Sequence, residues 1–216
     1  MKEELTEILP TLFPVDFFSI ECDVDYAEVK APFPKKMDKH FLPETSKLLK
    51  EEHFTQLALL WHEEGIWVEV QVLKAFEEAK YPEYKEADSV ELFFDTRNIK
   101  TAGFATRFCH HFVFLPSAVN GIQCKEVTRF RSEDSHPLSE VLDAEIEMEF
   151  HKKAYTMKIF LPKAVFCGYE PSNCSSIGFN YRINRPLKKP QHFSVSSEYY
   201  SIEQQPSLWA TLHLKK

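Results

Sequence analysis

The stretch DSVELFFD, at residues 88–95, decides the fold of this chain of 216 residues. Successive side chains of an extended strand point to opposite faces, so the stretch separates into two rows. The row with Leu92 and Phe94 is apolar, whereas the row with Glu91 and Asp95 carries carboxylates, which are costly to bury without a partner. The stretch therefore predicts a half-buried strand. On the face of the strand opposite the core, Glu91 is either a solvated surface group or part of a polar ligand face.

The same period of two recurs on both sides of this strand, and turn-forming residues separate the segments. Alternating segments lie at residues 18–26, 57–62, 66–73, 107–115, 144–150, 155–161, 177–183 and 208–214, and a further strand is expected at residues 124–131. Gly65 supplies the positive φ of a tight hairpin, and residues 45–52 predict a short helix. Because no βαβ pattern is present, we expect an all-β fold. It is an antiparallel β-sandwich of about nine or ten strands with one or two short helices.

The chain has the length of one ordinary domain, and we expect residues 1–216 to form a single β-sandwich. An N-terminal strand is predicted at residues 17–29. Three prolines mark the irregular stretch that follows, so a helical insertion is predicted at about residues 31–54.

Composition excludes several classes of partner. The formal net charge is −7, which argues against nucleic acid and anionic membranes because both need a basic surface. The five cysteines have no Cys-x-x-Cys spacing, so reduced thiols are expected rather than a disulfide framework or a zinc ribbon. The acidic start has no apolar core of a signal peptide, and no apolar run has the roughly 20 residues of a membrane helix. We therefore expect a cytoplasmic protein.

No catalytic motif is present, and we expect a protein that is not an enzyme. The sequence contains no Gly-x-Ser-x-Gly, no phosphate-binding loop and no His-Glu-x-x-His, the patterns that mark common hydrolase and nucleotide sites. His110 and His111 are adjacent in a strand, so their imidazoles face opposite sides of the sheet and cannot chelate one ion.

Four side chains in the non-core rows of their strands form the best candidate ligand face. They are Glu91, Asn180, Arg182 and Trp209. Carboxylate, amide and guanidinium groups can hydrogen-bond hydroxyls in pairs, and an indole can stack on a sugar ring, so the set suits carbohydrate recognition. Two alternatives remain open: Trp209 as a lid on the sandwich edge, and Arg182 as an ion-pair partner of Glu91.

At this point the chain resembles carbohydrate-binding module family 9, within the DOMON-like superfamily of β-sandwiches. The resemblance covers about residues 55–214. Four segments carry it in the family's order: the hairpin ALLWHEEGIWVEV at residues 58–70, the acidic strand at 88–95, the late strands at 155–162 and 177–184, and PSLWATL at 206–212.

The resemblance implies binding of glucans or xylans at chain ends by an aromatic clamp and polar side chains. It suggests Trp209 as one clamp wall and Tyr84 as the other aromatic. It also suggests Glu91 as a hydroxyl acceptor, with Arg182 and Asn180 as further candidates. Structural calcium is a family feature, whereas residues alone assign neither a metal nor a cofactor.

We therefore expect a non-catalytic sugar-binding module. The first alternative is an intracellular protein-interaction module, motivated by the negative charge and the exposed loop at residues 186–193. A third reading is a haem-binding DOMON domain, with Met148 and His110 as conceivable axial ligands.

Overall fold

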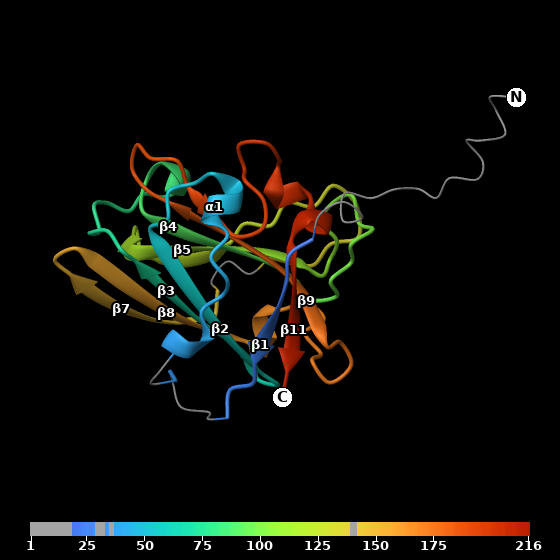
Figure 1. Ribbon diagram of the computed structural model, residues 1–216. Coiled ribbons are helices and arrows are strands. Elements are labelled where there is room, and N and C mark those ends of the chain that lie inside the picture. The colour runs from blue at the N-terminus through green and yellow to red at the C-terminus, as the bar shows by residue number, and fades with distance from the viewer. Residues whose placement is uncertain (1–18, 29–32, 35–36, 139–141) are drawn as a thin grey trace, which may run out of the picture.

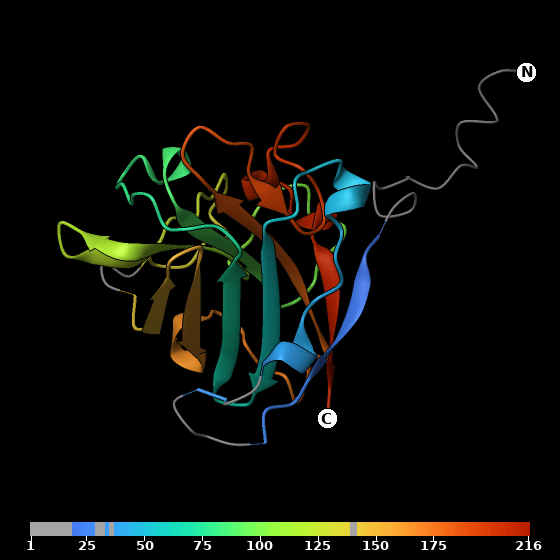
Figure 2. The ribbon, with the colours of Figure 1, turned by 60° about the vertical axis from the view of Figure 1, so that its left-hand side comes forward.

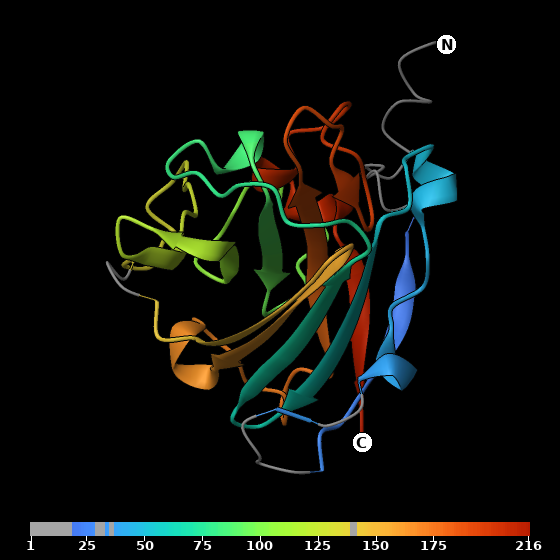
Figure 3. The same cartoon turned by 90° about the vertical axis from the view of Figure 1, so that its left-hand side faces the viewer.

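Two β-sheets pack face to face in this protein (Figures 1 and 3). The structure, a computed structural model, describes residues 19–28, 33–34, 37–138 and 142–216. One sheet has the order β1-β11-β9-β4-β5-β6 with β10 paired to β9, and the other has the order β2-β3-β8-β7. The strands of the larger sheet are β1 (Glu21–Asp25), β4 (Ser89–Asp95), β5 (Cys109–Val119), β6 (Ile122–Glu126), β9 (Ser176–Asn184), β10 (Gln191–His192) and β11 (Ala210–Lys215). The strands of the smaller sheet are β2 (Thr55–His62), β3 (Gly65–Val72), β7 (Glu145–His151) and β8 (Ala154–Pro162).

Helices are short and lie in the connections. They are α1 (Ser46–Leu49) and the 3-10 turns η2 (Asp38–His40), η3 (Tyr84–Glu86), η4 (Lys163–Val165), η5 (Ile202–Gln204) and η6 (Pro206–Leu208). Within the described ranges, none of these helices is long and apolar enough to cross a membrane.

The predicted sandwich is confirmed, with three corrections of detail. The described residues contain eleven strands rather than nine or ten. The sheet is not wholly antiparallel, because β1 runs parallel to β11, with Glu21 opposite Thr211. The strand expected at residues 124–131 ends at Glu126, and the chain then leaves the sheet without regular structure. This departure matters below because the segment that follows lines a cleft.

Two elements of the N-terminal part lie within the stretches predicted from the sequence. β1 lies inside the strand predicted at residues 17–29, and α1 lies inside the insertion predicted at residues 31–54. Residues 1–18, 29–32 and 35–36 lie outside the described ranges.

The main hydrophobic core fills the space between the two sheets. It includes Val90, Leu92 and Phe94, the apolar row of β4, each fully buried. Burial of one such side chain stabilises the fold by about 1.5–3 kcal/mol. The row of β4 that was expected to be polar, with Glu91 and Phe93, therefore lies on the outer face of the larger sheet.

The hairpin of β2 and β3 depends on one glycine. Gly65 has a φ of 153°, as the sequence predicted. A Cβ at this position would lie 2.2 Å from the carbonyl oxygen of Leu161 in β8. Glycine therefore allows β3 and β8 to approach at the point where the hairpin joins the middle of the smaller sheet.

Loops cover the outer face of the larger sheet. A second apolar cluster there consists of Phe93, Ala105, Cys109, Val195, Ile202 and Trp209. The chain between β3 and β4 and the long connection from β9 to β11 gather at one end of the sandwich, as Figures 1 and 2 both show. Over β4, β5 and β9 the outer face is therefore a second buried layer.

Candidate functional site

The site begins with two facing strands. β4 and β9 are antiparallel neighbours that place Glu91 opposite Arg182 and Ser89 opposite Asn184. Arg182 donates from Nε to Glu91 Oε1 at 2.6 Å and from Nη2 to Glu91 Oε2 at 2.6 Å. Glu91 is fully buried and Arg182 nearly so. The alternative reading of Arg182 as an ion-pair partner of Glu91 is therefore confirmed.

Two further donors complete the environment of Glu91. Asn184 Nδ2 donates to Oε1 at 2.6 Å, and the Nε2 atom of His111 lies 2.7 Å from Oε2. Burial alone would raise the pKa of Glu91, but the hydrogen bond from His111 and the charge of Arg182 outweigh it and hold the pKa well below its usual range. Glu91 is therefore an ionised group with both oxygens bound inside the protein.

The ion pair extends to the surface through Glu203. Arg182 Nη2 also donates to Glu203 Oε1 at 2.7 Å, and Lys85 Nζ donates to the same oxygen at 2.6 Å. The side chain of Glu203 is 20% exposed and that of Lys85 is 51% exposed. Burial by itself would raise the pKa of Glu203. The charge of Arg182 and the hydrogen bond from Lys85 have the larger effect and lower the pKa to about 2. A chain of alternating charges thus runs from the buried sheet face to solvent.

A cleft of about 880 Å³ opens where this chain of charges reaches the surface. Its lining includes Tyr81, Tyr84, His111, Arg129, Arg131 and Glu203. The rings of Tyr81 and Tyr84 stack at 6.5 Å between centroids, and the ring of His111 stacks on Phe93 at 4.2 Å. The volume lies within the range of small-molecule sites, and the lining combines aromatic rings with charged groups.

A second hollow of about 350 Å³ adjoins the cleft. It shares Lys85, Ser201 and Glu203 with the cleft, and it adds Tyr199 and Tyr200. These two tyrosines are 72% and 47% exposed. The two hollows therefore adjoin, and the ion pair of Lys85 and Glu203 lines both of them.

Trp209 is not at this surface, so the exposure expected for it is wrong. Its side chain is only 3% exposed, and its Nε1 donates to the carbonyl oxygen of Ile202 at 2.8 Å. The ring lies 5.7 Å from that of Phe93. The alternation correctly assigned Trp209 to the outer face, but the chain around Ile202 folds over that face, and the indole is a lid over the second apolar cluster.

The exposure expected for Glu91 is also wrong, because its oxygens are occupied by protein donors. Asn180 is likewise fully buried. Its Oδ1 accepts the backbone N–H groups of Tyr181, Phe193 and Ser194 at 2.9, 3.3 and 3.0 Å. Asn180 therefore fastens the loop after β10 to the sheet. Of the five predicted site residues, the structure brings Tyr84 to the cleft and Arg182 to the adjoining hollow, and their ligand roles stay predictions.

Apart from Tyr84, sequence reasoning missed the residues that form the rim of the cleft and of the adjoining hollow. His111 belongs to the row of β5 that faces away from the core, and Glu91 belongs to the corresponding row of β4. The alternation could therefore have placed the two side chains on the same face. The adjacent tyrosines at 199 and 200 lie in a serine-rich loop, a weak signal for an exposed aromatic pair. Nothing in the local sequence around Glu203 indicates that it reaches Arg182.

The one side-chain group in the described ranges that could hold an ion does not suit the calcium that the resemblance implied. Among the described residues, one group of three or more His, Cys, Asp or Glu side chains lies close enough to hold an ion, and it consists of His110, Glu126 and His136. Calcium takes six to eight oxygen ligands, and two imidazoles do not suit it. The haem reading also fails on geometry, because both ring nitrogens of His110 already have protein partners, Glu126 and the N–H of Cys167.

Comparisons with known proteins agree with this architecture. The family model described as "Carbohydrate family 9 binding domain-like" matches residues 34–216. A search of curated proteins gives no match.

Among solved structures, a carbohydrate-binding module family 9 from Caldicellulosiruptor kristjanssonii in complex with cellotriose is similar. It has a TM-score of 0.59 and 13% identity over 90% of this chain and 93% of that one. A module of this family from the same organism, in complex with glucose, has a TM-score of 0.58 and 13% identity and covers 90% of this chain and 95% of its own. A protein from Bacteroides uniformis has a TM-score of 0.55 and 13% identity and covers 92% of this chain and 100% of its own. At these identities the structures show a common fold, whereas the family model covers most of the chain. This chain belongs to the carbohydrate family 9 binding domain-like family.

Proposed function

We propose that this protein is a non-catalytic carbohydrate-binding module that holds a sugar in the cleft between η3 and the segment after β6. Family membership supports carbohydrate as the ligand class, and two of the similar structures carry cellotriose and glucose. The recognition face differs from the one expected from the sequence: it is the rim at Tyr84, His111 and Glu203 rather than the buried face at Trp209.

One observation carries this proposal: an aromatic wall stands beside hydrogen-bonding groups that buried partners hold in place. Glu203 is fixed by Arg182 and Lys85. His111 contacts Glu91 through Nε2, and its Nδ1 has no hydrogen bond within the described part of the chain. A carboxylate and an imidazole nitrogen accept hydroxyl protons. Groups that are already ordered lose little entropy when a ligand binds.

The protonation of Glu91 and Glu203 argues against a catalytic role for these two carboxylates. Glycoside hydrolysis requires one carboxylic acid that keeps its proton, which needs a raised pKa. Here the pKa of Glu91 is held well below its usual range and that of Glu203 falls to about 2, because both face Arg182. Neither group can act as the proton donor.

The test is isothermal titration calorimetry with glucose, xylose, cellobiose and xylobiose. We expect binding by the wild-type protein and a loss of about tenfold or more in affinity for Tyr84→Ala, since a ring in a ligand site can contribute about 2 kcal/mol. Tyr84→Phe should retain most of the affinity. Phe150→Ala is the matched control, because it removes a ring that is 52% exposed on β7, in the other sheet. Absence of binding across the panel, or an equal effect of Phe150→Ala, contradicts the proposal.

The protein-interaction alternative has one supporting observation. Leu187 is fully exposed in the loop before β10, and an apolar side chain at a loop tip can serve as a contact. A partner protein captured by the wild type, lost with Leu187→Ser and unaffected by free sugar, favours this alternative.

A further inference from the structure

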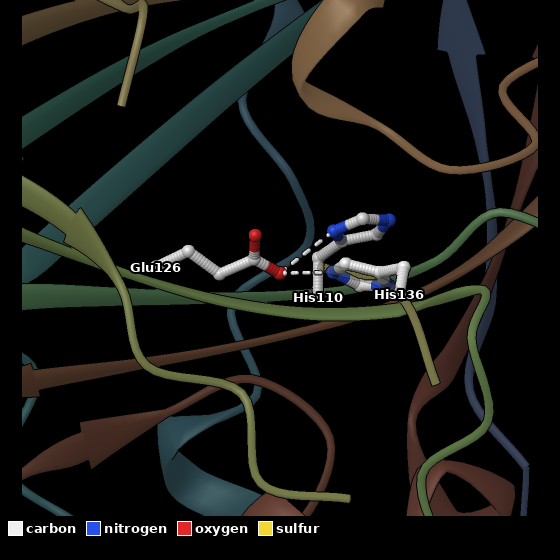
Figure 4. A group of neighbouring side chains, drawn as sticks. All are labelled: His110, Glu126 and His136. Carbon is white, nitrogen blue, oxygen red and sulfur yellow. Dashed lines mark hydrogen bonds and ion pairs between the residues drawn. The ribbon is translucent and has the colours of Figure 1, made fainter. Parts of the chain in front are cut away.

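The side chains of His110, Glu126 and His136 form a compact group in which both imidazoles face one carboxylate (Figure 4). A single oxygen of Glu126, Oε1, contacts Nδ1 of His110 and Nε2 of His136, both at 2.9 Å. The hydroxyl of Thr128 donates to the same oxygen at 2.7 Å. The two imidazole rings stack at 4.4 Å between centroids. One carboxylate oxygen therefore receives three donors.

The hydrogen bonds fix the protonation of His110. The backbone N–H of Cys167 donates to His110 Nε2 at 3.0 Å, so this nitrogen carries no proton. The ring proton is on Nδ1, where it faces Glu126. Burial lowers the pKa of His110, in spite of the opposing effect of Glu126, which agrees with a neutral ring.

His136 has the opposite character, because both of its ring nitrogens face acceptors. Nε2 faces the carboxylate of Glu126, and Nδ1 lies 2.6 Å from the carbonyl oxygen of Arg107. A neutral imidazole carries one proton and can donate only one of these bonds. Both bonds require the imidazolium. Burial lowers the pKa of His136, but the bond and charge of Glu126 outweigh it and the net pKa is raised above 6.5.

The same hydrogen bonds argue against a metal centre. A neutral imidazole that binds a metal through Nδ1 carries its proton on Nε2. On His110 that proton would face the N–H of Cys167, donor against donor.

His136 anchors the far end of the segment at residues 127–138, whose first part, at Val127 and residues 129–131, forms one wall of the cleft. Arg129 and Arg131, in the middle of this segment, line the cleft and make no ion pair within the described residues. The near end is held by Thr128, whose Oγ1 accepts the N–H of His111 at 2.9 Å.

Other attachments also hold this segment: the N–H of Val127 donates to the carbonyl oxygen of His111 at 2.8 Å, and Phe130 packs against the second apolar cluster. Gln204 donates to the carbonyl oxygen of Arg129 at 3.1 Å. The pair of Arg107 with Asp134 at 2.6 Å is largely exposed, and such pairs contribute little. The charged groups around His136 are therefore Glu126 on β6 and Arg107 and Asp134 at the surface, with neutral His110 on β5.

We propose that His136, as an imidazolium bound to Glu126 and to the Arg107 carbonyl, is a positioning residue that holds Arg129 and Arg131 against the sugar cleft. The attachment of this segment by protonated His136 is called the lock below. Its effect on affinity rests on the function proposed above, whereas the lock itself does not. A group whose pKa is higher in the folded state than in the unfolded state stabilises the folded segment. Its contribution is complete at pH values below the unfolded-state pKa and is lost as the pH rises through the folded-state pKa. The wall is therefore locked in acid and loosens in base.

Three measurements test the proposal on the whole chain. NMR titration of the histidine Cε1 protons should give His136 a pKa above 6.5. Hydrogen exchange, corrected for the intrinsic rate, should show that protection of residues 127–138 falls between about pH 6 and pH 9. The Kd for the best sugar of the panel should rise about three- to tenfold over the same range.

Variants separate a proton-dependent lock from simple packing. His136→Gln should bind sugar weakly at all pH values and lose the pH dependence. Glu126→Gln should move the midpoint of the pH dependence to lower pH, a shift that a purely steric role would not produce. His213→Gln is the matched control, because it removes another His–Glu contact of 2.9 Å, with Glu21, on an exposed part of β1 and β11.

Four results overturn the proposal: a His136 pKa at or below 6.5, protection that does not change with pH, the same pH dependence in His136→Gln as in the wild type, or Zn²⁺ that raises the thermal midpoint of the wild type but not of His136→Gln. If no sugar binds at any pH, the proposed function fails, and the titration and the exchange data still decide whether the lock exists.

Discussion

Replacing Glu91 by glutamine tests whether the buried ion pair holds the outer face of the larger sheet together. Glutamine has nearly the same shape but no charge, and one of its oxygen sites becomes a donor. That donor must face Arg182 or His111, which donate to Glu91 in the wild type. Arg182 is then left with Glu203 as its remaining carboxylate.

The cost follows from burial. Removing one partner of a fully buried pair typically costs about 3–5 kcal/mol. Because Arg182 keeps Glu203, we expect Glu91→Gln to lower the free energy of unfolding by about 2–4 kcal/mol. In a chain of this size each kcal/mol lowers the thermal midpoint by about 2–4 °C, so the expected decrease is about 4–16 °C.

Urea denaturation at neutral pH measures this change, with the slope m expected to stay the same. Glu147→Gln, at an exposed position on β7, is the control and should change stability by about 0.5 kcal/mol or less. The double variant Glu91→Gln, Arg182→Met should be more stable than the sum of the single changes predicts, because it removes the uncompensated charge. A loss below about 1 kcal/mol for Glu91→Gln, or strict additivity, would refute the reasoning.

Two further predictions concern the same face. Trp209→Ala should cost about 3–5 kcal/mol, seen as a large drop in the thermal midpoint, because it empties a site under the loop of Ile202; a midpoint within a few degrees of the wild type contradicts the buried position. Burial lowers the pKa of Lys100 from 10.5 to about 8, in spite of the charge of Asp95, so the folded state disfavours its charge. The stability of the wild type relative to Lys100→Met should therefore rise between about pH 8 and pH 10.5 in urea titrations, and a flat difference would show that this amine is solvated.

Local pattern determined much of the architecture. Period-two alternation depends only on the geometry of an extended chain, so it placed Val90, Leu92 and Phe94 in the core and Glu91 on the opposite face. The same rule correctly placed Arg182 and Trp209 outside the core rows of their segments. Gly65 indicated the hairpin because a tight turn needs a positive φ, which other residues rarely adopt.

What the alternation could not determine is whether a non-core face is open to solvent. Glu91 and Arg182 lie 91 residues apart in the chain, and their pairing depends on which strands become neighbours. The loop that buries Trp209 and brings Glu203 to Arg182 has no periodic pattern of its own. Its position results from long-range packing against Phe93, so only the tertiary structure moved the candidate site from the sheet face to its rim. His136 is the same case: its protonation is decided by Glu126 and a carbonyl from another segment, because a pKa reports surroundings that the local sequence does not contain.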